Sequence, residues 1–163
     1  METTNVKKEV QVINAEELLT HLKGHRKLTR RTIEIFPEEQ LFTYSIGGMR
    51  SFAELIQELL GIAAPGIKEI ATGNPAELQE NFDHQNKKAN LLEAWDKATV
   101  EIEKYWLQIE QERFQETIKS FGQYEGKVWE NIFYFIDNEI HHRAQAFVYL
   151  RALGIDPPFF WDR

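Results

Sequence analysis

The sequence contains no cysteine. A disulfide framework, a thiolate zinc site and catalysis by a protein thiol are therefore excluded. No stretch approaches the ~20 consecutive apolar residues that a membrane span requires, and residues 1–13 lack the apolar centre of a signal peptide. These absences predict a soluble, cytoplasmic protein that has no membrane partner.

Basic residues are also few. Lys and Arg together number 19 against 26 Asp and Glu, which gives a formal net charge of −7. A chain with this charge repels nucleic acid, so no nucleic-acid partner is expected. The segment Lys23–Arg31 is the one basic cluster. On a helix it predicts a solvated face paired with acidic neighbours, with an anion-binding patch as the alternative.

Capping residues and prolines divide the sequence into helical segments. A capping box at Asn14–Glu17 predicts a helix from about Ala15 to Phe36, which Pro37 ends. A second capping box at Ser51–Glu54 opens another helix to about residue 71. Within that helix we expect a kink or an interruption at Pro65, because proline removes one backbone hydrogen bond and clashes with the preceding turn.

Two further helices follow a long polar stretch. Residues 74–89 predict a link, and Asn90–Glu93 has a third capping signature that opens about five helical turns. The apolar pattern weakens between residues 111 and 126, and a last helix begins near Gly126 or Lys127. Four amphipathic helices with a long crossover between the second and third predict an all-α four-helix bundle, a single domain spanning residues 1–163.

The last helix carries polar residues in the middle of its apolar face. Asn138, Glu139 and His142 lie among apolar residues that recur at steps of three and four, and Asn138 and His142 point the same way. Buried polar groups cost free energy unless they have partners. This cluster is therefore the candidate functional site.

Several short segments, in this order and spacing, resemble the DinB/YfiT-like superfamily of four-helix bundles. They open the second and third helices, at residues 47–55 and 90–93, and they follow the first at Pro37–Glu39. The most specific segment is Asn138–Gln145, which is followed by Tyr149–Arg151 and by Gly154 and the pair at 157–158. The resemblance covers nearly the whole chain.

The resemblance implies a divalent-metal site and a homodimer. Family members typically hold zinc or nickel with three histidines, one from the second helix and two from the fourth, and some use a low-molecular-weight thiol as substrate. In this sequence the three positions fall on Glu58, Asn138 and His142. The implied function is a metal-dependent small-thiol S-transferase or hydrolase with a degenerate site between these helices.

The departure from three histidines changes the expected chemistry. An asparagine carbonyl is a weak neutral donor, so Glu58, Asn138 and His142 would bind a metal less tightly and favour manganese or iron(II) beside zinc and nickel. Asp137 with His141, or Glu139, would be substitute ligands. The alternative is a satisfied polar cluster without metal, in a non-catalytic stress-response or interaction bundle.

Four remaining features carry weaker expectations. Arg143 either supports the site electrostatically or forms a surface salt bridge. His21 and His25 are spaced to chelate a metal, but their Lys and Gly neighbours indicate exposure. The segment Phe159–Trp161 is expected to pack on the bundle or on a second subunit. Core positions are expected for three tryptophans: Trp95, Trp106 and Trp129.

Overall fold

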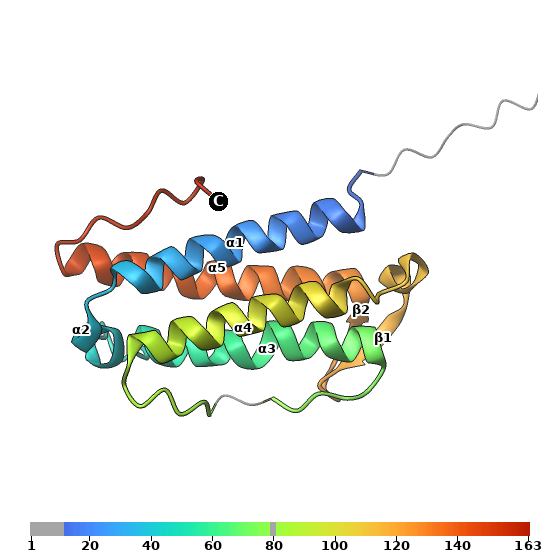
Figure 1. Ribbon diagram of the computed structural model, residues 1–163, viewed down its shortest axis with the longest axis horizontal. Coiled ribbons are helices and arrows are strands. Elements are labelled where there is room, and N and C mark those ends of the chain that lie inside the picture. Colours follow the sequence, from blue (N-terminus) through green and yellow to red (C-terminus); the bar gives the residue numbers. More distant parts are fainter. Residues whose placement is uncertain (1–11, 79–80) are drawn as a thin grey trace, which may run out of the picture.

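The computed structural model describes residues 12–78 and 81–163. Within these ranges four long helices lie side by side (Figure 1): α1 (Ala15–Ile35), α3 (Phe52–Thr72), α4 (Lys88–Trp106) and α5 (Val128–Ala152). The main contacts join α1 and α3 each to α4 and α5. The predicted all-α four-helix bundle is confirmed. The polar character of residues 1–13 also predicts an extended lead-in, but nearly all of these residues lie outside the described ranges.

The second and third long helices run in the same direction. Figure 1 shows α3 and α4 side by side, with the chain returning below them between the end of one and the start of the other. Two parallel neighbouring helices need a connection as long as the bundle, and the connection from 73 to 87 supplies it. The long crossover predicted from the polar stretch is therefore present.

The first two capping boxes form as predicted, and the third does not. Asn14 and Glu17 bond reciprocally at the start of α1, and Ser51 and Glu54 do so at the start of α3. Helix α4 instead begins at Lys88, and the Asn90 side chain donates to the backbone oxygen of His84 at 3.0 Å. Asn90 lies inside the first turn, where its amide bonds backward to the preceding loop.

Pro65 does not interrupt α3, which continues to Thr72. The residues on either side of the proline are buried, so packing against neighbouring helices holds the turn that has lost a hydrogen bond. One turn of this region also approaches α5 closely. A Cβ atom on Gly66 would lie 2.4 Å from Cζ of Phe135, so only glycine leaves room for that ring. This contact sets the spacing of the two helices that carry the candidate site.

Four short elements are absent from the sequence prediction. They are α2 (Glu38–Thr43), the 3₁₀ helix η1 (Gln111–Gln115), and an antiparallel hairpin of β1 (Thr117–Ser120) and β2 (Tyr124–Lys127). Each has fewer than seven residues, which is too short for a hydrophobic period to be recognised. The hairpin and α2 lie at opposite ends of the bundle in Figure 1.

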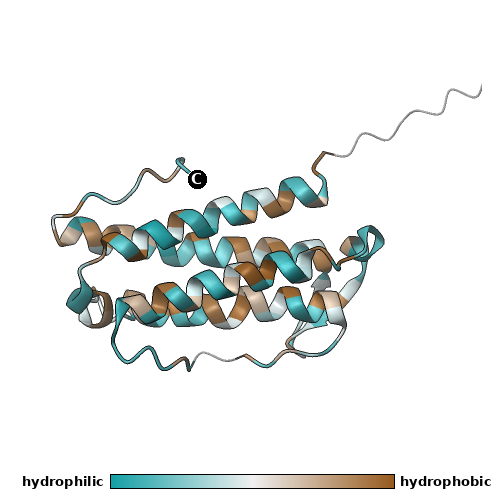
Figure 2. Cartoon of the chain, viewed as in Figure 1, coloured by the Kyte–Doolittle hydropathy of each residue, from teal (hydrophilic) through white to brown (hydrophobic). Residues whose placement is uncertain are grey.

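The core consists of two apolar clusters along the bundle, and the helices carry hydrophobic and hydrophilic residues on different faces (Figure 2). Trp95 and Trp106 are buried, as predicted. Trp129 is 37% exposed, so its predicted core position is wrong. It lies in the first turn of α5, next to a pocket that Leu18 of α1 also lines. Across residues 12–78 and 81–163, no helix combines the length and the apolar character of a membrane span.

The segment after α5 turns back along α1 (Figure 1). Asp162 holds it there by accepting from Arg31 at 2.8 Å. Phe159, Phe160 and Trp161 are each more than 60% exposed, so packing of these rings on the chain's own bundle is ruled out. The other expectation, packing on a second subunit, stays a prediction.

Candidate functional site

The structure brings Glu58, Asn138 and His142 together between α3 and α5. The Nε2 atom of His142 lies 3.0 Å from Oε1 of Glu58, and the Asn138 amide donates to the same oxygen at 3.3 Å. His142 is buried and the Glu58 side chain is 16% exposed. The convergence predicted from sequence alignment with the family pattern is therefore present, at the edge of the bundle interior.

Two further residues complete this cluster, which we call the Glu58 cluster. The Arg50 guanidinium, just before α3, pairs with Oε2 of Glu58. On the other side, Nδ1 of His142 lies 3.0 Å from Oε1 of Gln145. Both ring nitrogens of His142 thus face side-chain oxygens, so the ring links Glu58 of α3 to Gln145 of α5.

The electrostatics of the cluster favour an ionised carboxylate. Burial by itself would raise the pKa of Glu58, but the hydrogen bonds from Arg50 and His142 outweigh it and hold the pKa below its ordinary value. The carboxylate is therefore charged at neutral pH and shared among three donors: Arg50, Asn138 and His142.

This donor set fits a divalent metal poorly. Each Glu58 oxygen already accepts from a protein donor, and the Arg50 charge beside Oε2 opposes a second cation. Asn138 turns its NH₂ group, which has no lone pair to offer, toward the carboxylate. In the described ranges, no group of three His, Cys, Asp or Glu side chains is placed to hold a metal ion. We therefore derive no chemical step through a metal.

The substitute ligands do not join the Glu58 cluster. Asp137 and His141 are exposed on α5. Glu139 is buried, but its Oε1 accepts from the Thr29 hydroxyl at 2.6 Å on α1. The polar residues of α5 thus divide between two sites, one toward α3 and one toward α1.

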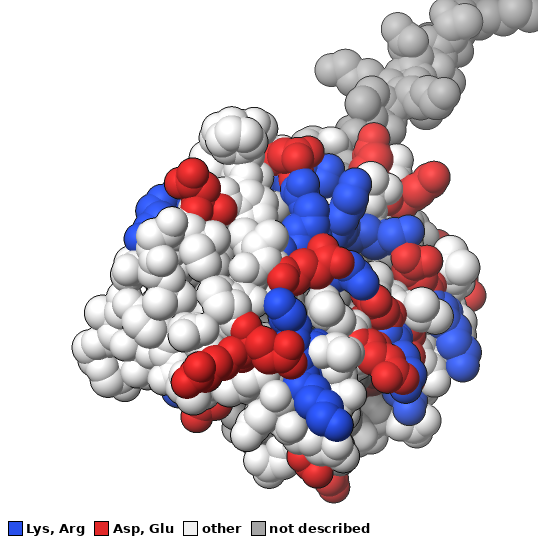
Figure 3. All heavy atoms as spheres, turned by 60° about the vertical axis from the view of Figure 1, so that its left-hand side comes forward, with Lys and Arg blue, Asp and Glu red and all other residues white. Residues whose placement is uncertain are grey.

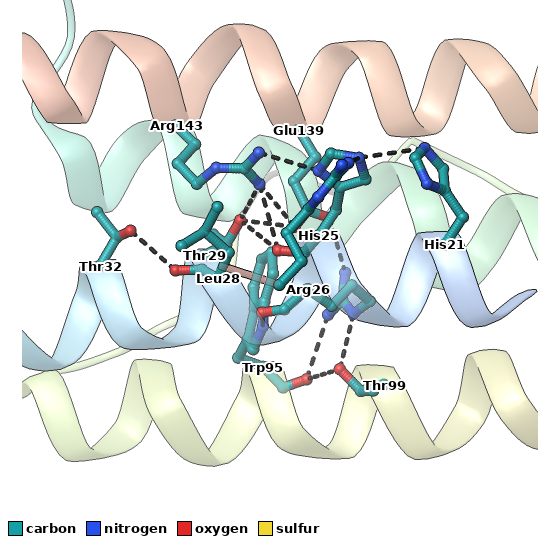
Figure 4. Close-up of polar contacts among 11 residues, drawn as sticks. His21, His25, Arg26, Leu28, Thr29, Thr32, Trp95, Thr99, Glu139 and Arg143 are labelled. Carbon is teal, nitrogen blue, oxygen red and sulfur yellow. Dashed lines mark hydrogen bonds and ion pairs between the residues drawn. The ribbon is translucent and has the colours of Figure 1, made fainter. Parts of the chain in front are cut away.

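The site toward α1 is a buried charged network that sequence reasoning missed (Figure 4). At its centre Glu139 lies between Arg26, at 3.6 Å, and Arg143, at 3.7 Å, and all three side chains are at most 5% exposed. The Arg26 guanidinium lies 3.8 Å over the Trp95 ring and donates to Thr99 at 2.7 Å. The network therefore ties α1, α4 and α5 together.

The expectation of a surface salt bridge for Arg143 is wrong. Arg143 is buried and donates to Oγ1 of Thr29 and to Nδ1 of His25, each at 3.0 Å. It also does not reach the Glu58 cluster, because none of its contacts involves α3. It stabilises the α1–α5 interface instead.

The predicted exposure of the His21–His25 pair is wrong for His25, which is buried. Burial, followed by the nearby Arg143, His21 and Arg163 charges, lowers the pKa of His25 to about 3, so the ring is neutral. Both ring nitrogens of His25 face guanidinium groups, Nδ1 that of Arg143 at 3.0 Å and Nε2 that of Arg163 at 2.8 Å, and Nε2 also lies 3.2 Å from Nε2 of His21. Two cationic groups against the ring of His25 argue against chelation of a metal ion by this pair.

A sequence signal for the buried network did exist. His25 and Thr29 continue the spacing of Leu18, Leu22 and Ile33, at steps of three and four, on the buried face of α1. The charged neighbours in the segment Lys23–Arg31 hid this pattern. Elsewhere in that segment the predicted pairing with acidic residues holds, since Lys23 pairs with Glu103 and Arg30 with Asp96.

The chain belongs to the DinB family, whose family model matches residues 1–161. Among solved structures, it is similar to a DinB-like protein from Bacillus cereus ATCC 10987, with 14% identity and a TM-score of 0.73 over 90% of this chain and 97% of that one. It is also similar to the DinB-like protein YjoA from Bacillus subtilis, with 20% identity and a TM-score of 0.70 over 90% and 99%. At these identities the two structures establish the shared fold. No curated protein matches this sequence.

Proposed function

We propose that this DinB-family protein is a non-catalytic interaction bundle whose family metal site has become a metal-free polar cluster. The observation that supports the proposal is the state of the Glu58 carboxylate, which accepts from Arg50, His142 and Asn138 at once. These bonds satisfy a partly buried charge without a cation. In this role the Glu58 cluster joins α3 to α5 and stabilises the bundle.

A second candidate is the metal-dependent enzyme that the family resemblance implies. It is favoured by one specific observation, the convergence of Glu58, Asn138 and His142 from two helices. A divalent ion such as zinc, nickel, manganese or iron would lower the pKa of a bound thiol or water, as S-transfer or hydrolysis requires. To bind it, the cluster must first release Arg50 and turn the Asn138 amide.

Metal content separates the two candidates. Protein purified without chelator is expected to hold no stoichiometric transition metal by elemental analysis. Its melting temperature is expected to stay unchanged when zinc, nickel or manganese is added, because a ligand stabilises only a state that it binds. One bound ion per chain, or a metal-dependent rise in melting temperature, would favour the metal-dependent enzyme over the metal-free interaction bundle.

We propose that the partner of this bundle is a second copy of the chain, bound along the outer face of α5. Trp129, Phe133, Ile140 and Val148 lie within one side of that helix and are 37–54% exposed. An apolar stripe of this kind is typical of a protein–protein contact. It runs nearly the whole length of α5, which suits an isologous dimer.

Light scattering after size-exclusion chromatography tests the dimer. The wild type is expected at twice the 19.2 kDa of the chain. Val148→Asp is expected to move the mass toward one chain, because it places a charge in the apolar contact. Leu107→Asp, at an 82% exposed position outside α5, is the matched control and should leave the dimer intact. A monomeric wild type, or equal effects of the two variants, would refute this arrangement.

A further inference from the structure

A cavity of about 440 Å³ lies between α1 and α4, and no member of the Glu58 cluster lines it. This volume is within the range of small-molecule sites. The side chains that line the cavity are mostly positively charged, whereas the chain as a whole has a net negative charge. Five are cationic and one is acidic: Lys23, Arg26, Lys27, Arg30 and Arg163, with Asp96.

Helical spacing explains why three of these cations meet. Lys23, Lys27 and Arg30 follow one another at steps of four and three on α1, so they share one face. Arg163 comes from the segment that runs back along α1, and it packs on Gly24. A Cβ atom on Gly24 would lie 3.2 Å from Cβ of Arg163, so the glycine makes room for this fourth rim cation.

Arg26 forms a fixed floor for the cavity. Its guanidinium is 1% exposed, lies over Trp95, and donates to Thr99 and to the backbone oxygen of Trp95 at 3.2 Å. Two of the rim cations are paired with acids, Lys23 with Glu103 and Arg30 with Asp96.

The other two rim cations have no acid within ion-pair distance among the described residues, although the Asp162 carboxylate, which pairs with Arg31, interacts electrostatically with Lys27. Within the described residues Lys27 makes no hydrogen bond or ion pair, and the Arg163 side chain contacts only the neutral His25 ring. The rim therefore carries more positive than negative charge next to a cavity. This is the arrangement that attracts an anion.

We infer that this cavity binds a small organic phosphate. Lysine and arginine side chains that converge on one point engage a phosphate group, and arginine offers it a planar pair of donors. The volume leaves space for an organic body, which would lie against Val100 and Thr99 on the α4 wall. Both residues present methyl groups there.

A long polyanion does not fit the same surface. Figure 3 shows carboxylates interspersed among the Lys and Arg side chains on the face in view, beside a broad area without charged residues. A nucleic acid that reached the cavity would extend over this mixed surface on a chain of net charge −7. A ligand confined to the cavity avoids that repulsion.

Calorimetric titration of the full-length protein at an ionic strength of ~0.1 M tests the site, with adenosine monophosphate, inorganic phosphate and citrate as probes. The nucleotide is expected to bind, inorganic phosphate more weakly, and citrate least. Lys27→Glu should weaken nucleotide binding about tenfold or more, because it removes one charge-assisted contact and adds repulsion. Its melting temperature should match the wild type, since Lys27 is exposed and unpaired.

The matched control is Lys119→Glu, which makes the same change of charge at an exposed position on β1. It should leave the affinity within about twofold, because charges farther apart than ~10 Å are screened. An equal loss of nucleotide affinity in both variants would show that the effect depends on the overall charge of the protein, and it would overturn the proposed site. Citrate binding as tight as the nucleotide would overturn the assignment to phosphate, as would the absence of any nucleotide binding.

Discussion

Replacing Glu139 by alanine is expected to lower the free energy of unfolding by about 3–5 kcal/mol, the usual cost of removing one member of a buried ion pair. Glu139 lies between Arg26 and Arg143, and neither guanidinium can reach water. Burial raises the pKa of Glu139, and the two arginine charges and the Thr29 hydroxyl oppose that rise. Without the carboxylate, two positive charges would face each other in the core.

Urea or thermal unfolding measures this loss. Asp137→Ala is the matched control, because it removes an exposed carboxylate two residues away on the same helix. Surface changes of that kind usually stay within about 0.5 kcal/mol. A loss below about 1 kcal/mol for Glu139→Ala would mean that the network relaxes around the missing charge and does not hold the three helices together.

The double substitution Glu58→His with Asn138→His is expected to create a metal site. The family resemblance implies a site of three histidines at these positions, and His142 is already in place. The side chains at 58 and 142 already approach to 3.0 Å. Imidazole is a good ligand for zinc and nickel. Arg50, which is 44% exposed, can turn to water once the carboxylate is gone.

A shift in melting temperature on metal addition measures the gain. At a free zinc or nickel concentration 100 times the dissociation constant, the double variant should be stabilised by about 2.7 kcal/mol, and the wild type by nothing measurable. Adding His142→Ala to the double variant should abolish the effect. If the melting temperature of the double variant does not change when metal is added, then residues other than these three also prevent metal binding at this site.

Sequence reasoning predicted the long helices well because their signals are redundant. The capping boxes at Asn14 and Ser51 and the apolar stripes predict the same helices. Tertiary packing therefore did not change the local structure that these signals favour. The capping role predicted for Asn90 and the interruption predicted at Pro65 were wrong for opposite reasons. The Asn90 segment has the sequence of a capping box, but Asn90 lies inside the first turn of α4 and bonds to the preceding loop. Pro65 disfavours a helix locally, but the packing of its neighbours maintains α3.

The candidate site was predictable only in part. Alignment with a family pattern located Glu58, Asn138 and His142, since equivalent positions on equivalent helices meet in the same place. It did not indicate Arg50, because a residue before α3 follows no helical period. That unforeseen arginine is the group that argues most directly against a bound cation.

The arrangement of the helices also has a consequence for how the chain forms during synthesis. Glu58 precedes His142 by 84 residues, and Thr29 precedes Glu139 by 110. A ribosome makes the chain from its first residue, so α1, α3 and α4 emerge before the helix that both polar clusters need. Until α5 follows, Arg26 lacks its acidic partner and Glu58 lacks its two partners on that helix, and the apolar surfaces that α5 covers are exposed. The nascent protein is therefore most exposed to aggregation just before its last helix is released.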